Sequence, residues 1–254
     1  MQNSISNMVQ RMVNILSSCA PSIYLYGSVV LDDFKLGWSD IDILVLTQVP
    51  ISEEQAYRLV NLRQTMLDDE PSNPYYRAIE GGMLTVNAFL SGEPDRVVYW
   101  GTSGERITTR YYFDSFSMCQ LLDSGILLYG DDVRTQMPRP TYSELKTDVR
   151  RHYEAIRQFA QKTGRDLYSY GWLLDISRCI YTLRTGKILA KTAAGEWGLQ
   201  ENICPCPDAL VKAVEIRKDP IKFKNDARTF DYAETLGDSI QRYADVLENA
   251  LKGS

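Results

Sequence analysis

The sequence predicts an α+β fold: a mixed β-sheet with flanking helices over residues 1–138, followed by an all-α helical bundle over 139–254. Three observations support this division. Apolar, strand-like runs occur only in the first half, near residues 22–26, 40–46 and 79–89. The segment Pro138-Arg139-Pro140 places two prolines in three residues, which blocks a regular element. After it, apolar residues recur at helical spacing.

The elements of the first half alternate between helix and strand. Apolar residues at helical spacing predict a helix over about 5–18 and a second, polar-faced helix over about 52–69. The strand at 22–26 runs directly into Gly27-Ser28, where we expect a short helix to begin. Gly81-Gly82 weakens the third strand. In the second half, periodicity predicts helices over about 141–162, 168–185, 189–197, 207–217 and 229–251.

Composition excludes several classes of protein. A net charge of −5 argues against a broad nucleic-acid-binding surface. Five scattered cysteines argue against a disulfide framework and favour a reducing compartment. His152 is the only histidine, which excludes histidine-based triads and multi-histidine metal sites. With neither a signal peptide nor an 18-residue apolar run, we expect a cytoplasmic protein without membrane partners.

Two aspartates begin the second predicted strand. Asp40 and Asp42 are two residues apart, so on a strand their side chains point to the same face. Ile41 and Ile43 then point to the opposite, buried face. Two carboxylates of this kind can converge on one hard cation, and Mg²⁺ typically takes one or two carboxylates plus phosphate oxygens of a substrate. The pair therefore predicts a magnesium site that is completed by a nucleoside triphosphate.

The end of the first predicted strand supplies a second part of the same pattern. Gly27 allows a phosphate to approach the backbone closely. The Ser28 hydroxyl and nearby amides can then hold phosphate oxygens. A strand, Gly-Ser, a helix, Asp-x-Asp and a further apolar strand form a rare combination. Together they predict nucleotidyl transfer, in which AMP or another NMP moves onto a hydroxyl of a small molecule.

These residues resemble the signature of the polymerase-β-like nucleotidyltransferase superfamily, Gly-Ser followed by [Asp/Glu]-x-Asp. Within it, the chain is similar to the bacterial streptomycin/spectinomycin (aminoglycoside) adenylyltransferases. Further similarity lies in Arg77-Ala-Ile-Glu80, in Leu127-Leu-Tyr-Gly130 and in Ile176-Ser-Arg-Cys-Ile-Tyr181 with the lysine that follows it at position 191.

The resemblance implies specific roles. Asp40 and Asp42 would hold Mg²⁺, and Glu80 would be the general base that accepts the proton of the acceptor hydroxyl. Gly27 and Ser28 would contact the triphosphate of ATP. Further candidates bind phosphate or substrate: Arg178 and Lys191 for the phosphates, Trp100 and Asp175 for the acceptor. Trp100 is a candidate for stacking because it is expected in a loop over residues 99–105.

The predicted function is Mg²⁺-dependent transfer of AMP from ATP to a hydroxyl of an aminoglycoside-type antibiotic, which gives resistance. One feature departs from the adenylyltransferases: an acidic stretch about ten residues before the matching arginine is replaced by Tyr168-Ser-Tyr170. Alternatives are therefore a lincosamide or metabolite acceptor. Separate alternatives are an antitoxin-like enzyme that modifies a protein, and an inactive binding module, which the presence of Gly27, Ser28, Asp40 and Asp42 disfavours. We expect the active site between the two domains, in a monomer or dimer.

Overall fold

A computed structural model describes residues 1–94, 96–101 and 104–253 of the chain. The chain divides into two compact units. Unit 1 comprises Met1–Phe34 and Ser39–Arg139, and unit 2 comprises Lys35–Trp38 and Pro140–Ser254. Across the described residues, no helix is both long enough and apolar enough to span a membrane.

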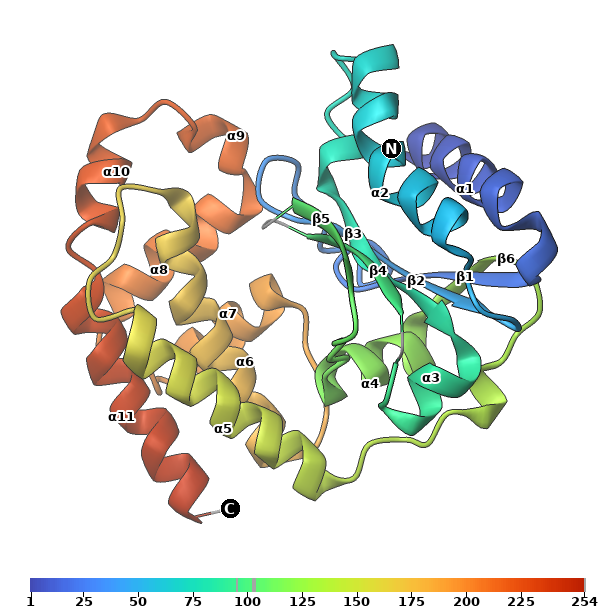
Figure 1. Cartoon of the computed structure of the whole chain (residues 1–254). Coiled ribbons are helices and arrows are strands. Elements are labelled where there is room, and N and C mark those ends of the chain that lie inside the picture. Colours follow the sequence, from blue (N-terminus) through green and yellow to red (C-terminus); the bar gives the residue numbers. More distant parts are fainter. Residues whose placement is uncertain (95, 102–103, 254) are drawn as a thin grey trace. The chain divides into compact units, whose positions relative to one another are not determined.

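Unit 1 is built on a six-stranded mixed sheet with the strand order β5-β4-β3-β2-β1-β6 (Figure 1). The strands are β1 (Pro21–Tyr26), β2 (Ile41–Thr47), β3 (Ile79–Thr85), β4 (Val97–Gly101), β5 (Gly104–Thr108) and β6 (Ile126–Tyr129). The pair β2–β3 is parallel and the other neighbours are antiparallel. The mixed sheet predicted from the sequence is thus confirmed.

Helices cover both faces of this sheet (Figure 1). The helices α1 (Gln2–Leu16) and α2 (Glu53–Asp69) lie on one face, while α3 (Val86–Ser91) and α4 (Ser115–Ser124) lie on the other. Alternate residues of β2 enter the two cores: Ile41 and Ile43 pack toward α1 and α2, whereas Leu44 packs toward α3 and α4. Three short 3-10 turns complete the unit: η1 (Ser17–Cys19), η2 (Tyr76–Ala78) and η3 (Arg134–Gln136).

The helix expected after Gly27-Ser28 does not form, so that prediction was wrong. Residues 27–32 form successive turns instead, with Leu31 N donating to Gly27 O at 3.3 Å and Asp33 N to Ser28 O at 2.9 Å. The backbone of Asp32 is left-handed, with φ of +54°. A left-handed residue cannot continue a right-handed helix, and the chain turns away at this point.

Two further expectations for unit 1 need correction. The third strand ends at Thr85 rather than near residue 89, because the Thr85 hydroxyl accepts a hydrogen bond from Ala88 N at 3.1 Å and starts α3. The segment expected to be a loop over 99–105 belongs to β4 and β5, which pair antiparallel. Of that segment, residues 102–103 lie outside the described residues.

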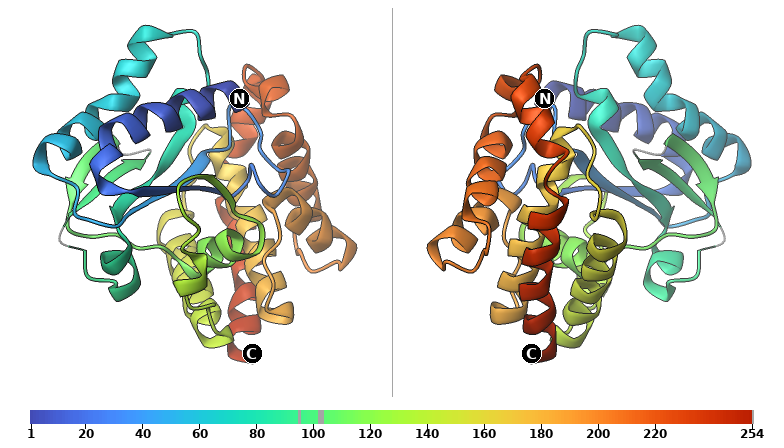
Figure 2. Two further views of the ribbon diagram at one scale, coloured as in Figure 1. Left: turned by 90° about the vertical axis from the view of Figure 1, so that its right-hand side faces the viewer. Right: turned by 90° about the vertical axis from the view of Figure 1, so that its left-hand side faces the viewer.

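Unit 2 is helical. Its helices are α5 (Tyr142–Phe159), α6 (Gly171–Thr185), α7 (Lys191–Gln200), α8 (Pro207–Lys218), α9 (Pro220–Phe223), α10 (Ala227–Ala233) and α11 (Gly237–Gly253), with the 3-10 turn η4 (Leu167–Tyr170) before α6. The helices α5, α6 and α11 pack side by side (Figures 1 and 2). A single helix over about 229–251 was expected, but α10 and α11 are separate. The predicted helical second half is otherwise confirmed.

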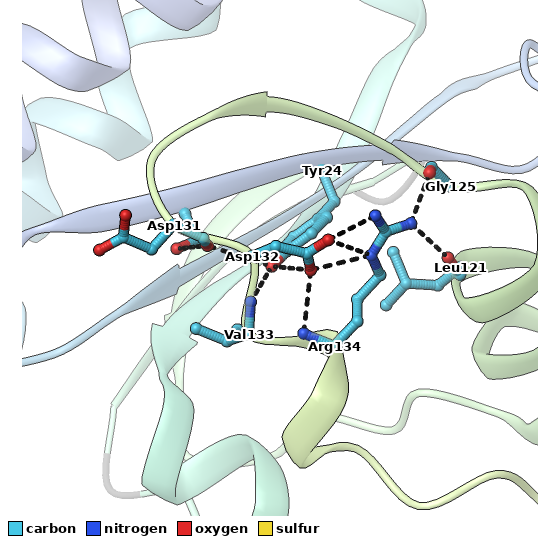
Figure 3. Close-up of polar contacts among 8 residues, drawn as sticks. Tyr24, Leu121, Gly125, Asp131, Asp132, Val133 and Arg134 are labelled. Carbon is cyan, nitrogen blue, oxygen red and sulfur yellow. Dashed lines mark hydrogen bonds and ion pairs between the residues drawn. The ribbon is translucent and has the colours of Figure 1, made fainter.

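A polar network fastens the segment after β6 to β1 (Figure 3). The Tyr24 hydroxyl donates to the Asp132 carboxylate at 3.2 Å and accepts from Val133 N at 2.7 Å. The Arg134 guanidinium donates to the same carboxylate at 2.6 Å and to the Gly125 carbonyl, also at 2.6 Å. Hydrogen bonds from Arg134 hold the pKa of Asp132 at about 2, below its usual value of 3.8.

We expect Asp132→Asn to lower the free energy of unfolding at neutral pH. Because the folded-state pKa lies below the unfolded one, the carboxylate's contribution is complete above about pH 4 and is lost as the pH falls to about 2. The Asp132 side chain is 42% exposed, so after solvent screening we expect roughly 1 kcal/mol. Denaturant titrations at several pH values would measure this.

Asp131→Asn is the matched control, because only the backbone carbonyl of Asp131 takes part in this network, as acceptor from Ser22 and Tyr24. An Asp132→Asn deficit that persists unchanged at pH 2 would contradict the assignment of the stability to the charged carboxylate.

Candidate active site

Three carboxylates gather where β2 and β3 begin. In the sheet register, Asp42 pairs with Tyr26 of β1 on one side and with Glu80 of β3 on the other. Paired residues on neighbouring strands lie about 5 Å apart and point to the same face. Asp40 comes two residues before Asp42, just ahead of β2. The structure therefore brings together the three acids that the sequence singled out, although their roles stay predictions.

The turn after β1 lies against Asp42. A Cβ atom added at Gly27 would come within 2.0 Å of Asp42 Oδ2, and Gly27 has a left-handed φ of +72°. Both facts require glycine here. The Ser28 hydroxyl donates to the backbone carbonyl of Asp40 at 3.2 Å, which ties the turn to the start of β2. Gly27 and Ser28 thus stand beside the carboxylates, as expected.

Aromatic side chains line the same face of the sheet. Tyr26 lies edge-on to Phe113, with 5.1 Å between ring centroids, and the Phe113 and Tyr111 rings are 6.2 Å apart. Burial raises the pKa of Tyr26 well above its usual value, and the charges of Asp42 and Asp114 add to this. Burial also raises the pKa of Tyr111. At neutral pH these phenols are uncharged hydroxyls beside the Asp42 carboxylate.

The two glycines that weakened the third predicted strand have specific steric reasons. A Cβ atom at Gly81 would meet the Ile43 carbonyl oxygen at 1.8 Å, and one at Gly82 would meet the Tyr111 ring at 2.4 Å. Gly81 therefore permits the close pairing of β3 with β2, and Gly82 makes room for the ring. They are the two residues that follow Glu80, so the tight pairing lies next to the candidate base.

Trp100 cannot stack on a substrate, and its assignment to the acceptor was wrong. The residue has no exposed surface, packs in the core beneath α1 and α2, and donates from Nε1 to the Leu59 carbonyl at 3.1 Å. Its neighbour Tyr99 points to the opposite face, because successive residues on a strand alternate. Burial raises the pKa of Tyr99, and the charge of Glu80 is the next contribution.

Tyr99 is therefore the aromatic side chain that sequence reasoning missed. It is half-buried, and the charges of Glu80, Asp40 and Asp42 add to the rise of its pKa. The Arg106 guanidinium lies 4.5 Å from the centroid of its ring. The signal that could have identified Tyr99 is strand parity, but it becomes readable only once residues 97–101 are known to be a strand.

The remaining predicted residues gather in unit 2. The Asp175 carboxylate on α6 forms ion pairs with Arg178, at 3.2 Å, and with Lys191 at the start of α7, at 3.1 Å. These side chains are only 18%, 14% and 32% exposed respectively. Burial acts to raise the pKa of Asp175, but the charges of Lys191, Arg178 and His152 outweigh it and lower the pKa. The carboxylate therefore stays ionised between two cations.

The first site has the donor chemistry of a magnesium ion shared with a substrate. Within the described residues, no group of three or more His, Cys, Asp or Glu side chains is arranged to enclose a metal. Asp40 and Asp42 supply hard oxygen donors, and the missing side chain of Gly27 lets the Asp42 carboxylate lie directly against the backbone of the turn. Two carboxylates suit Mg²⁺, which keeps other positions for phosphate oxygens or water.

Comparison with known proteins gives matches in both halves of the chain. Residues 9–72 match the nucleotidyltransferase domain family, and residues 142–212 match the C-terminal domain of aminoglycoside adenylyltransferases. The fold is similar to that of the spectinomycin adenyltransferase AAD(9) from Enterococcus faecialis, which was crystallised with ATP and spectinomycin. The TM-score is 0.69 at 18% identity, over 95% of this chain and 97% of that one. By its two family matches, one in each half, the chain is a nucleotidyltransferase of the aminoglycoside adenylyltransferase type.

Proposed function

We propose that this enzyme transfers AMP from ATP to a hydroxyl of an aminoglycoside-type antibiotic, in a reaction that requires Mg²⁺. The observation that carries the proposal is the register that pairs Asp42 with Glu80, with Asp40 two residues before Asp42 and the Gly27 backbone directly against the Asp42 carboxylate. The solved structure of AAD(9) with ATP and spectinomycin supports the choice of nucleotide and of acceptor class.

The carboxylates have distinct tasks in this reaction. Asp40 and Asp42 would hold Mg²⁺, which when bound neutralises phosphate charge. Glu80, one strand away, accepts the proton of the acceptor hydroxyl. The hydroxyl oxygen forms a bond to the α-phosphorus, the bond from that phosphorus to the bridging oxygen breaks, and pyrophosphate leaves with the electron pair. A hydroxyl is a weak nucleophile at neutral pH, so a positioned base is required.

Two cations of unit 2 are the proposed phosphate-binding residues. Arg178 and Lys191 would bind the triphosphate and stabilise the charge that develops on pyrophosphate. Asp175 holds both of them within 3.2 Å, which fixes their positions before the nucleotide arrives. We therefore assign Asp175 to orienting these two side chains, in place of the direct contact with acceptor that the sequence suggested.

The acceptor is the open part of the proposal. In the neutral segment Tyr168-Ser-Tyr170, Tyr170 is fully buried and donates to the Thr229 carbonyl at 2.8 Å, so it serves the fold. Tyr168 is 61% exposed. Because this segment lacks the acidic residues of the streptomycin-modifying relatives, a neutral or less cationic acceptor, such as a lincosamide, is the second candidate.

A pyrophosphate-release assay tests the function directly. The purified enzyme is incubated with ATP, Mg²⁺ and one acceptor at a time: streptomycin, spectinomycin, other aminoglycosides or lincomycin. The masses of the products are then measured by mass spectrometry. We expect one class of antibiotic to gain the mass of AMP, and EDTA to stop the reaction. If no acceptor in this panel causes release of pyrophosphate, the proposed acceptor class is refuted. If the enzyme does not bind ATP, nucleotidyl transfer is refuted.

Gly27→Ala is expected to reduce transfer by about 10²-fold or more, because the new Cβ would collide with Asp42 Oδ2 and displace a reacting group. Gly92→Ala is the matched control: Gly92 has nearly the same φ, +70°, but nothing lies within 4 Å of its added Cβ. Both variants pay about 1–2 kcal/mol for a left-handed alanine. Steady-state rates report the effect of the collision with Asp42, and thermal unfolding reports the strain of the left-handed alanine. Equal rates in the two variants would show that the contact with Asp42 is unimportant.

A further inference from the structure

The loop between Ser28 and Asp40 contains a segment that packs in unit 2. Residues Lys35–Trp38 belong to unit 2, while the chain on both sides of them belongs to unit 1. These four residues form a turn in which Trp38 N donates to Lys35 O at 3.0 Å. Gly37, third in the turn, has a φ of +85°, as type II turns require at this position. The turn presents Trp38 to the helical unit.

Trp38 is held there as a core residue. It is 6% exposed and packs against the N-terminus of α6, where a Cβ added at Gly171 would lie 3.7 Å from Trp38 Cζ2. Its ring lies 6.2 Å from that of Tyr168. The Arg217 guanidinium, on a residue only 2% exposed, is 5.6 Å from the Trp38 ring centroid. A cation beside an indole ring is most strongly bound when both are removed from water.

The position of this anchor in the chain gives it a role beyond packing. Trp38 is separated from Asp40 by one residue, Ser39, which is itself buried. Asp40 in turn accepts the hydrogen bond of Ser28 through its backbone carbonyl. A shift of Trp38 is therefore transmitted through two peptide bonds to a candidate metal ligand, and through one hydrogen bond to a candidate phosphate contact.

We propose that Trp38 is a positioning residue for nucleotidyl transfer: by anchoring in the helical unit, it fixes the loop that carries Ser28 and Asp40. The inference rests on the proposed function for its kinetic consequences, although the loop conformation can be measured without it. The same α6 that receives Trp38 carries Asp175 and Arg178. The position of the Trp38 indole thus depends on α6, the helix that bears the candidate phosphate-binding residue Arg178.

Trp197 provides a matched control. It also lies in unit 2, packs edge-on against Tyr181 with 5.2 Å between centroids, and has the Arg184 guanidinium 5.5 Å from its ring. Replacing Trp197 by alanine removes the same side chain and a comparable guanidinium contact. Only Trp38 is part of the loop between Ser28 and Asp40.

The first experiment compares Trp38→Ala, Trp38→Phe and Trp197→Ala in the full chain. We expect Trp38→Ala to lower kcat by about 10²-fold, the effect of displacing a reacting group by about 1 Å, and Trp38→Phe to recover most of that loss. Trp197→Ala should leave kcat within a few-fold. Trypsin should cut after Lys35 about tenfold faster in Trp38→Ala than in the parent, because cleavage follows local opening of the loop. Mass spectrometry identifies the cut.

Gly37 tests the same idea without disturbing the core. It is exposed, and nothing lies within 4 Å of an added Cβ, so Gly37→Ala strains only the turn. Gly37→Asn is the control, because asparagine tolerates left-handed backbone. We expect Gly37→Ala to lower kcat and to speed cleavage after Lys35, and Gly37→Asn to resemble the parent.

The outcomes separate this proposal from the proposed function. If the parent binds ATP and Mg²⁺ but transfers AMP to no acceptor, the function fails, while the rate of trypsin cleavage after Lys35 still decides whether Trp38 holds the loop. If Trp38→Ala and Trp197→Ala lower kcat equally, or Trp38→Ala leaves both kcat and cleavage after Lys35 unchanged, Trp38 is an ordinary core residue. If Trp38→Ala does not fold, the two Gly37 variants decide the question. Equal kcat values and equal rates of cleavage after Lys35 in Gly37→Ala and Gly37→Asn would overturn the proposal.

Discussion

Replacing Asp42 by asparagine is expected to abolish AMP transfer, by at least about 10³-fold, with little change in stability. The substitution keeps the size of the side chain but removes the charge that would bind Mg²⁺. The fold should tolerate it, because asparagine reduces the crowding of like charges that Asp40, Asp42 and Glu80 form where β2 and β3 begin. We expect the free energy of unfolding to change by less than about 1 kcal/mol.

Calorimetry distinguishes a lost metal ligand from a general defect. In the parent, Mg²⁺ should strengthen ATP binding, and in Asp42→Asn this dependence should largely disappear. Asp40→Asn should behave similarly, since Asp40 lies two residues before Asp42 at the same strand end. Asp68→Asn, on the exposed surface of α2, is the control for the substitution itself. Normal turnover of either active-site variant in Mg²⁺ would remove the metal assignment.

The carboxylate cluster could be predicted because its geometry follows from local rules. The two-residue spacing of Asp40 and Asp42 fixes their face on any strand. Apolar residues follow Asp40 and Asp42, so β2 was recognisable as a strand, whereas Gly81-Gly82 weakened the signal for β3. The parallel pairing of the two strands, which places Glu80 beside Asp42, comes from the structure. The helix expected after Gly27 was a local error. Asp32 adopts left-handed backbone, which aspartate tolerates but which its presence in the sequence does not predict.

The positions of the tryptophans depend on long-range contacts. Trp100 was assigned to a substrate because residues 99–105 read as a loop; as part of β4 it pairs with Glu105 of β5 and turns into the core. Likewise, the seat of Trp38 is formed by residues more than a hundred positions away, Gly171 and Arg217 among them. No local pattern around position 38 reports such partners, since burial here is decided by packing between distant segments.

Glu80→Gln is expected to lower the rate of AMP transfer by roughly 10²–10⁴-fold, the usual worth of a general base, while ATP and acceptor still bind. Glutamine keeps the size and the hydrogen bonding of glutamate but cannot accept the proton. A base must be ionised to act, so kcat of the parent should fall at acid pH, and the residual rate of the variant should lack this fall. Steady-state kinetics across pH, beside calorimetry with each substrate, measure both effects.

The contrast with Asp42 makes this prediction specific to the chemical step. Asp42→Asn should weaken the Mg²⁺-dependent binding of ATP, whereas Glu80→Gln should not, although the two residues are register partners on adjacent strands. Glu93→Gln, the same substitution on an exposed residue, is the control. If Glu80→Gln turns over at the parent rate, the base must be another group. If it abolishes acceptor binding and leaves the chemistry of bound substrate intact, Glu80 selects the acceptor instead of activating it.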